Sequence, residues 1–271
     1  MSKRSNNGTA YDLIGPEDGD VLVLIHGLGL RRETWSDHLS ALAEKYRVLS
    51  YDLYGHGETV QPPKTPSLKL FARQLAELME ELSISSAHIS GFSLGGMINR
   101  RLAIDSPELV SSLIILNSPH ERGEEAQKLV EERAAQTSAG GPGATLDTTI
   151  ERWFSPDYIR SHPIQIQMVR DWVLANDPDS YALCRQVLAH GVKELIRPTP
   201  AIDKPTLVIT CENDSGSTPA MSHGIAGEIS GAETLIIPEL QHMGLMERPE
   251  LFTGPTLKFL NTLNSQGKSN G

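Results

Sequence analysis

The most informative segment of the chain reads His88-Ile89-Ser90-Gly91-Phe92-Ser93-Leu94-Gly95-Gly96-Met97. An apolar run ends in Gly91-x-Ser93-x-Gly95, and a helical pattern follows at once. This order predicts a strand that turns sharply into a helix, with Ser93 at the bend. Glycines flank the serine because a side chain on either side would clash in so tight a turn. The turn is expected to hold the Ser93 hydroxyl above the sheet edge, at the positive end of the helix.

Further short apolar runs predict strands that are buried on both faces of a parallel sheet. They occupy residues 21–25, 47–51, 112–116, 206–210 and 234–237. Segments with apolar residues at helical spacing separate these runs, as between residues 67 and 82. Strands that alternate with helices indicate an α/β fold in which helices cover both faces of the sheet.

The alternation stops between residues 121 and 197, where four segments look helical and no strong strand pattern occurs. We therefore expect a core domain in two parts, 1–120 and 198–271, with a helical cap inserted at 121–197. The insertion interrupts the sheet at a carboxyl end, where ligands of α/β proteins bind. The apolar residues expected to line a pocket under this cap are Trp153, Phe154, Met168 and Trp172. The alternative is an ordinary helical subdomain whose aromatic residues fill its own core.

The composition narrows the functional classes. The chain has 271 residues, 39% of them hydrophobic, and a formal net charge of −10. Nucleic acid is not an expected partner, because no basic excess is available to neutralise phosphates. No apolar run reaches the roughly 18 residues of a membrane-spanning helix, and no apolar segment follows the basic N-terminus, so we expect a cytoplasmic protein without a membrane partner. The polar ends, residues 1–8 and 264–271, are expected to be a disordered and a frayed tail.

Three residues that suit acyl chemistry follow different predicted strands, in the order Ser93, Asp214, His242. Serine is a weak nucleophile and needs a base to take its proton as it attacks a carbonyl. A histidine can take that proton near neutral pH and return it to the leaving group. An aspartate orients the histidine ring and stabilises its charged form. The three residues are therefore candidates for a catalytic triad.

Other residues compete for the acid and base roles. The rivals for the acid are Glu212 and Asp203, and those for the base are His223, His120 and His190. Some hydrolases carry the acid after an earlier strand, but this chain has Asn117-Ser118 there, which favours Asp214. His242 is favoured because it alone follows the last predicted strand. His26 and His56 are expected to structure loops, and the nine histidines lack the spacing of a metal site, so no metal is expected.

The chain resembles the lidded α/β-hydrolases, in particular small carboxylesterases and 3-oxoadipate enol-lactonases. The resemblance covers residues 20–263, and its carriers are His26-Gly27, Asp52-x-x-Gly55-His56-Gly57, Gly91-Phe92-Ser93-Leu94-Gly95-Gly96, Asp214 and Gln241-His242. It implies the α/β-hydrolase fold, with a mostly parallel sheet, helices on both faces and an inserted four-helix lid. That fold uses the same chain order of serine, acid and histidine. The resemblance further implies that the backbone N–H groups of Leu28 and Leu94 form the oxyanion hole.

The residues around the triad narrow the reaction. Serine at position 93 argues against dehalogenases and epoxide hydrolases, which carry aspartate there. Carbon–carbon bond hydrolases of this architecture commonly have asparagine where this chain has Phe92 and tryptophan where it has Met243. We therefore expect hydrolysis of an ester or lactone of a small, largely apolar molecule, through an acyl-enzyme and without a cofactor. Met243 and His120 are expected to contact the substrate; His120 and Arg122 meet its polar end or, alternatively, belong to a solvated loop.

Three alternatives use the same residues. A carbon–carbon bond hydrolase would share the triad. An acyltransferase or perhydrolase would resolve the acyl-enzyme with a nucleophile other than water. A small-molecule receptor derived from a hydrolase would bind its ligand under the lid without turnover, and such receptors can retain the triad. The sequence carries no signal for an oligomeric state.

Overall fold

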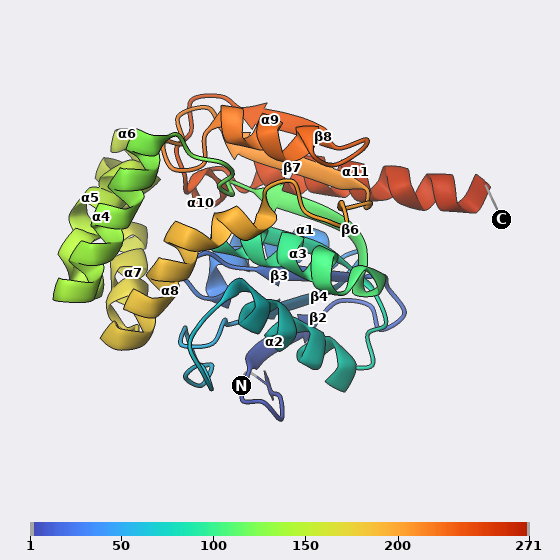
Figure 1. The fold of residues 1–271 in the computed structure, drawn as a ribbon. Helices are drawn as coiled ribbons and strands as arrows, with labels where there is room; N and C mark the ends of the chain where they lie inside the picture. The colour runs from blue at the N-terminus through green and yellow to red at the C-terminus, as the bar shows by residue number, and fades with distance from the viewer. Residues whose placement is uncertain (1–2, 270–271) are drawn as a thin grey trace.

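The computed structural model describes residues 3–269, with side chains up to residue 265, and is built around one eight-stranded sheet (Figure 1). The strand order is β1-β2-β4-β3-β5-β6-β7-β8. The strands are β1 (Lys3–Arg4), β2 (Ala10–Ile14), β3 (Val21–Ile25), β4 (Arg47–Tyr51), β5 (Ala87–Phe92), β6 (Val110–Leu116), β7 (Thr206–Cys211) and β8 (Glu233–Ile237). The predicted α/β fold with a mostly parallel sheet is confirmed.

The strands β4, β3, β5, β6, β7 and β8, which are neighbours in this order, all run parallel. Their carboxyl ends therefore meet at one edge of the sheet. Their runs of Val, Ile and Leu are buried because helices cover both faces, except in the edge strand β8, where only Ile237 is buried. Side chains that follow β3, β5, β6, β7 and β8 are thereby brought together at this edge. The chain passes from β3 to β4 on one side of β3 and then returns to β5 on its other side. In α/β proteins, ligands bind at the carboxyl ends of the strands where the order reverses in this way.

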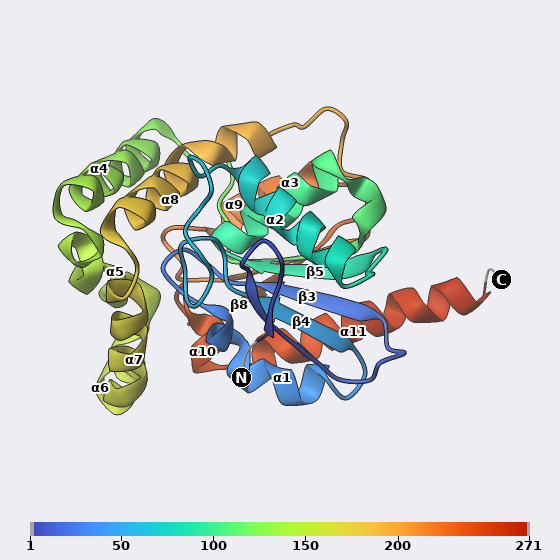
Figure 2. The same ribbon diagram turned by 90° about the horizontal axis from the view of Figure 1, so that it is seen from below.

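Helices cover both faces of the sheet. They are α1 (Ser36–Leu42), α2 (Leu68–Glu81), α3 (Leu94–Asp105), α9 (Pro219–Gly227), the short α10 (Gly244–Glu247) and α11 (Glu250–Ser269). Figure 2 shows α2 and α3 on one face and α1 and α11 on the other. Short 3-10 turns occupy Arg32–Trp35, Pro107–Leu109, Pro142–Thr145 and Gly191–Leu195.

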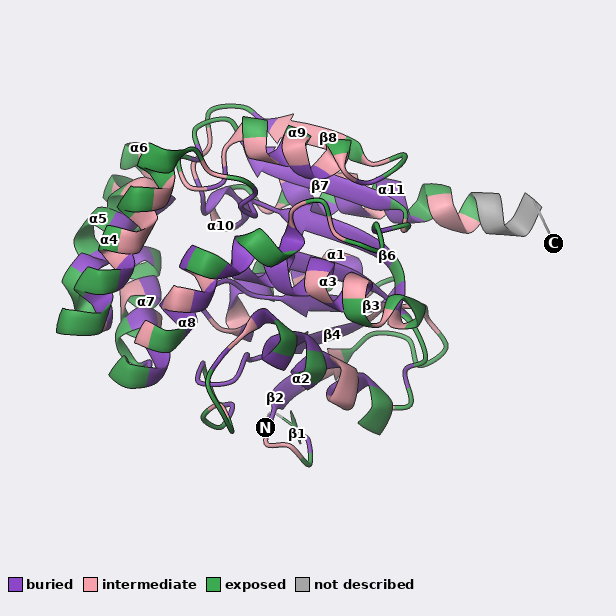
Figure 3. Ribbon diagram, viewed as in Figure 1, coloured by how far each residue is buried: buried purple, intermediate pink, exposed green. Residues whose placement is uncertain are grey.

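A group of helices lies between β6 and β7 in the chain, and we call it the inserted helices. Its members are α4 (Glu124–Gly140), α5 (Leu146–Trp153), α6 (Pro156–Ser161), α7 (Pro163–Leu174) and α8 (Pro178–His190). They stand together at one end of the sheet (Figure 1), and α4 packs against α8. Figure 3 shows a buried sheet and largely exposed outer faces on the inserted helices.

The two ends of the chain differ from the predicted tails. Residues 3–14 form a hairpin in which β1 pairs with β2, and β2 pairs antiparallel with β4. The polar turn is fixed because the Asn6 N–H donates to Glu81 and the Asn7 side chain donates to Glu77, both on α2. At the other end, α11 continues to Ser269, so the prediction of a frayed tail is wrong for residues 264–269. Residues 1–2 and 270–271 of the predicted tails lie outside the described residues.

None of the helices within residues 3–269 combines the length and the apolar character that a membrane span requires.

Candidate active site

Ser93 occupies the turn between β5 and α3 with a positive φ of 55° and a ψ of −112°. A Cβ added at Gly91 would lie 2.2 Å from the Gly95 carbonyl oxygen, and one at Gly95 would lie 2.3 Å from the Ile25 carbonyl oxygen. Backbone atoms of this kind cannot move aside, so both positions require glycine. The Ser93 N–H donates to the Leu116 carbonyl at 2.8 Å, which ties the turn to β6. The strained serine is therefore held at the N-terminus of α3.

Asp214 follows β7 and is only 2% exposed. Its Oδ1 accepts hydrogen bonds from the N–H groups of Gly216 (2.8 Å) and Ser217 (2.9 Å). Its Oδ2 accepts from Asn117 Nδ2 at 2.9 Å and from His242 Nδ1 at 2.6 Å. Burial alone would raise the pKa of Asp214, but the charge of His242 and these hydrogen bonds outweigh it and hold the pKa below its usual value. The carboxylate is thus ionised and acts only as an acceptor.

His242 follows β8, and its ring packs against Phe92 and Trp153, with ring centroids 4.9 Å and 5.9 Å away. Because the ionised Asp214 can only accept, His242 Nδ1 is the donor in this contact, and Nε2 is the ring nitrogen left to act as a base. The next residue, Met243, donates its N–H to the Trp153 carbonyl at 2.7 Å, which connects the histidine loop to α5. Ser93 and His242 line the same cavity.

The loop after β3 brings Gly27 and Leu28 to this cavity. His26 fixes the loop: its Nδ1 donates to the Gly27 carbonyl at 2.8 Å, and its Nε2 accepts from the Leu53 N–H at 3.0 Å. Complete burial lowers the pKa of His26 to about 4, so the ring is neutral and this donor and acceptor pattern is stable. Among the described residues, no protein acceptor is found for the N–H groups of Leu28 and Leu94. Both donors remain available to a ligand.

The cavity has about 650 Å³ of space between protein atoms, its open mouth included. Its apolar wall consists of Leu28, Leu30, Phe92, Pro119, Val130, Trp153 and Leu188. Its polar wall carries four guanidinium groups, those of Arg122, Arg133, Arg152 and Arg185. They come from the loop after β6 and from α4, α5 and α8, so the inserted helices supply most of the charge.

Sequence reasoning missed three of these arginines. Arg133, Arg152 and Arg185 belong to separate helices and to no motif, and only the tertiary fold brings them together. A weak signal was present: neither Arg152 nor Arg185 has an acidic residue three or four positions away along its helix. Arg73, Arg101 and Arg160, which lie outside the cavity lining, all have such a partner.

Of the apolar residues proposed for the pocket, Trp153 lines the cavity at Ser93. Met168 and Trp172 instead line a separate surface hollow on α7, together with Ile164. The phase of the helix explains the difference, because Ile166, Val169 and Val173 form its buried face. Phe154 is fully buried and stacks on Tyr158 with ring centroids 5.4 Å apart, away from the lining.

The two other proposed contact residues are also buried behind the cavity. His120 Nε2 lies 3.1 Å from the Glu228 carboxylate. Met243 is fully buried in the core. Neither His120 nor Met243 lines the cavity. The residues that precede them in the chain, Pro119 and His242, do line it.

The chain is similar in sequence and in fold to known hydrolases. A profile described as the Alpha/beta hydrolase family matches residues 22–253. The chain is 27% identical over 246 residues to (E)-2-((N-methylformamido)methylene)succinate hydrolase of Acinetobacter baylyi, covering 91% of this chain and 92% of that protein. It is also 27% identical over 243 residues to 3-oxoadipate enol-lactonase 2 of the same organism, covering 89% of each. The crystal structure of the enol-lactonase from Burkholderia xenovorans LB400 superposes with a TM-score of 0.87 at 28% identity, covering 94% of this chain and 98% of that one. The chain belongs to the alpha/beta hydrolase family.

Proposed function

We propose that the chain is a serine hydrolase that cleaves an ester or a lactone through an acyl-enzyme on Ser93. The observation that carries the proposal is the 2.6 Å contact between His242 Nδ1 and Asp214, in a cavity that Ser93 and His242 line together. The names of relatives add support for the bond type, since two of them are enol-lactonases. Family membership supports hydrolysis in general.

In the first half of the reaction, Ser93 Oγ attacks the carbonyl carbon while its proton moves to His242 Nε2. The charged imidazolium that results is stabilised by Asp214, whose low pKa keeps it ionised. The bond between the carbonyl carbon and the ester oxygen then breaks, and His242 protonates the departing alkoxide. In the second half, water attacks the acyl-enzyme, gives its proton to His242, and Ser93 regains a proton as the acid leaves.

The N–H groups of Leu28 and Leu94 are our candidates for the oxyanion hole. Leu94 begins α3, so its amide lies at the positive end of a helix dipole. Leu28 belongs to the loop that His26 fixes. A preorganised donor of this kind is worth about 3 to 4 kcal/mol of transition-state stabilisation. Both amides lack a protein acceptor among the described residues, as this role requires.

We further propose that the segment 121–197 is a cap over the site. The support is its contribution to the cavity: Trp153 approaches the ring of His242, and Arg122, Arg133, Arg152 and Arg185 complete the wall. Substrate size and charge would then be selected by this segment, and chemistry by the sheet edge.

The test is covalent labelling of Ser93 by a fluorophosphonate, followed by mass spectrometry of the labelled peptide. The expected result is a single adduct on Ser93 and none in Ser93→Ala. Ser93→Ala is also expected to abolish turnover of p-nitrophenyl acetate and butyrate, whereas the exposed Ser111→Ala retains both reactions. An unlabelled Ser93 would overturn the proposal and favour the ligand receptor, whereas full turnover by Ser93→Ala would overturn it in favour of another nucleophile. Adding an alcohol during turnover separates hydrolysis from acyl transfer, since only a transferase converts the acyl-enzyme mainly into a new ester.

A further inference from the structure

The four arginines of the cavity, which we call the arginine wall, are Arg122, Arg133, Arg152 and Arg185. Arg185 is 6% exposed, and the other three are partly buried. Arg152 lies beside the acid loop, because a Cβ built on Gly216 would be 3.7 Å from Arg152 Nη1 and 3.6 Å from Asp214 Oδ1. The positive charge therefore extends from the inserted helices to the immediate surroundings of the triad.

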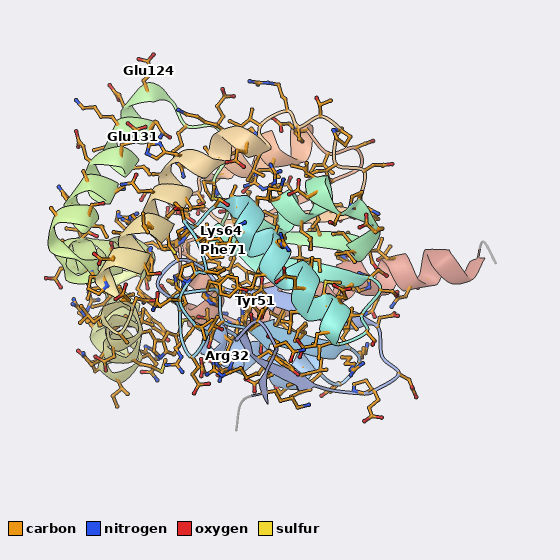
Figure 4. All side chains as sticks on the ribbon, turned by 60° about the horizontal axis from the view of Figure 1, so that its bottom comes forward. Arg32, Tyr51, Lys64, Phe71, Glu124 and Glu131 are labelled. Atoms are coloured by element: carbon orange, nitrogen blue, oxygen red, sulfur yellow. The ribbon has the colours of Figure 1, made fainter. Side chains whose placement is uncertain are left out.

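No carboxylate of the described residues lies within 4 Å of any guanidinium of the arginine wall, although the chain has 34 acidic residues. The acids of α4 are directed elsewhere: Glu131 lies 3.7 Å from His190, and Glu124 stands at the exposed end of the helix (Figure 4). Asp214 forms no ion pair with Arg152, because its oxygens are occupied by His242, Asn117 and two backbone amides, although its charge acts to raise the pKa of Arg152. The protein therefore compensates the positive charge only in part.

Hydrogen bonds satisfy the arginine wall only in part. Arg185 has the Tyr181 hydroxyl as a side-chain partner. Within the described part of the chain, no acceptor is found for the guanidinium groups of Arg133 and Arg152, and the buried Nε of Arg152 is unpaired. Arg122 donates to Gln127 and to the carbonyls of Leu188 and Ala189 at 3.3–3.4 Å, but its buried Nε is also unpaired. Buried donors without acceptors are costly and rare unless a ligand uses them.

The arginines also repel one another. Burial, and then the charges of Arg133 and Arg185, lower the pKa of Arg152 to about 10. Burial and the charge of Arg185 likewise lower the pKa of Arg133, and burial lowers that of Arg122 to about 10. At neutral pH all these groups keep their charge, so the free protein holds like charges together at a cost that an anionic ligand would remove.

We propose that the ester or lactone that reaches Ser93 carries at least two carboxylate groups, which bind to the arginine wall. This inference rests on the proposed function, because it names the substrate class of the same site. A planar guanidinium binds a carboxylate through two parallel hydrogen bonds, and arginine is the residue suited to such recognition. Arg133 and Arg185 lie close enough to Arg152 for their charges to lower its pKa, whereas Arg122 is not among these neighbours. One carboxylate then binds this cluster, and a second binds Arg122 in the loop after β6. The substrate is therefore anionic, in contrast to the largely apolar molecule that the sequence led us to expect.

The experiment compares two esters of the same shape. Monophenyl tricarballylate has two free carboxylates, and its dimethyl ester has none, while the scissile phenyl ester is unchanged. The expected kcat/KM of the wild type is about 100-fold higher for the dianion, about tenfold for each charge-assisted contact. The advantage should shrink in high salt, because ions screen partly buried charge pairs. Equal or faster turnover of the dimethyl ester would overturn the inference.

Variants assign the effect to the arginine wall. Arg133→Gln and Arg185→Gln are each expected to lower the ratio of the two kcat/KM values about tenfold. Arg160→Gln, on the same inserted helices but exposed and paired with Asp157, removes the same charge and should leave the ratio unchanged. An unchanged ratio in both wall variants would overturn the assignment.

Two readouts separate this inference from the proposed function. Fluorophosphonate labelling of Ser93 needs no carboxylate, so a labelled protein that prefers neutral esters refutes the anionic substrate alone. Thermal unfolding needs no catalysis: tricarballylate should raise the Tm of the wild type and not that of the wall variants. Without the ligand, Arg133→Gln should unfold at or above the wild-type Tm, because the repulsion among the arginines is relieved. If tricarballylate left the Tm of the wild type unchanged, that result would count against the inference.

Discussion

Asn117 donates a hydrogen bond to Asp214 at 2.9 Å, and the accepting atom is Oδ2, the same oxygen that faces His242. Asn117 directly follows β6 and has a positive φ of 44°, a conformation that asparagine adopts more readily than most residues. Some hydrolases carry the acid of the triad at the position of Asn117. Here the Asn117 amide instead donates to Asp214, the acid that follows the next strand. The arrangement fixes which oxygen of Asp214 is presented to the histidine ring.

Asp214→Asn is expected to lower kcat for phenyl esters by about 10³- to 10⁴-fold, because an amide that donates toward Nδ1 favours the wrong tautomer of His242. Adding Asn117→Asp should restore about tenfold of that loss, since a carboxylate then returns to hydrogen-bonding distance of the same place. Steady-state kinetics with circular dichroism checks of folding would measure both effects. Asp203→Asn, at an exposed carboxylate that the sequence left as a rival, is the control and should retain wild-type kcat. A large loss in the control would reassign the acid.

Gly95→Ala is expected to destabilise the protein by about 3 kcal/mol, because the new Cβ would lie 2.3 Å from the Ile25 carbonyl oxygen in a packed interior. The matched control is Gly227→Ala at the exposed end of α9, where a Cβ would meet no atom within 4 Å. That change should stabilise by about 0.5 to 1 kcal/mol through the entropy of the unfolded chain. Urea unfolding of the two variants gives the comparison, and similar unfolding free energies would show that the turn at Ser93 relaxes.

The sequence predicted the sheet and the turn because their signals are local. An apolar run is buried wherever a parallel sheet forms. The motif Gly91-x-Ser93-x-Gly95 predicts a tight turn because side chains at the two glycine positions would clash. Asp214 and His242 could be identified as candidates from the sequence because each comes shortly after a strand. Parallel strands bring such residues together at one edge of the sheet.

What the sequence did not predict depends on distant partners. The hairpin at residues 3–14 is fixed by Glu77 and Glu81 of α2, which no local pattern reveals. Met168 and Trp172 were assigned to the pocket by composition, but the phase of α7 decides which residues face inward. The arginine wall assembles from separate elements, and its missing acidic partners become visible only once the fold is known.

Three fully buried histidines should make the protein acid-sensitive. Burial lowers the pKa of His26 and of His38 to about 4 and that of His56 to about 3. A histidine in the unfolded chain has a pKa near 6.5, so below that pH the unfolded state binds more protons than the folded state. Stability is therefore complete above about pH 6.5 and is lost as the pH falls toward 4. Each histidine should lower the free energy of unfolding by about 2 kcal/mol between pH 7 and pH 5.

His38→Asn tests this pH dependence at one site. His38 Nε2 donates to the Leu245 carbonyl at 3.0 Å, and Nδ1 accepts from the Thr253 hydroxyl at 2.7 Å, so the neutral ring is built into the contact between α1 and α11. The variant should be less stable at pH 7, yet its unfolding free energy should fall less between pH 7 and pH 5, by about 2 kcal/mol. Urea unfolding at pH 7, 6 and 5 supplies the slopes. Parallel slopes in variant and wild type would mean that His38 is protonated in the folded state.

Arg32 neutralises Asp52 in the loop that follows β4. The side chain of Arg32 is 7% exposed and contacts Asp52, Asp12 (2.7 Å) and Glu58 (2.6 Å), and Figure 4 shows it beside the N-terminal strands. Asp52 is fully buried, and burial raises its pKa even though the Glu58 and Arg32 amides and the Arg32 charge act in the opposite direction. The adjoining Leu53 N–H holds His26, so this ion pair also supports the loop of Leu28.

Arg32→Met should lower the free energy of unfolding by about 3 to 5 kcal/mol at pH 7, because it leaves a buried carboxylate without its cation. The loss should shrink at pH 5, since an unpaired Asp52 has a still higher pKa and takes up a proton in the folded state. Arg73→Met removes an exposed pair with Glu77 and should change stability by no more than about 0.5 kcal/mol. Urea unfolding of both variants at the two pH values tests the argument. If Arg32→Met were as stable as Arg73→Met, or lost equal stability at both pH values, Asp52 would not depend on Arg32 for its charge.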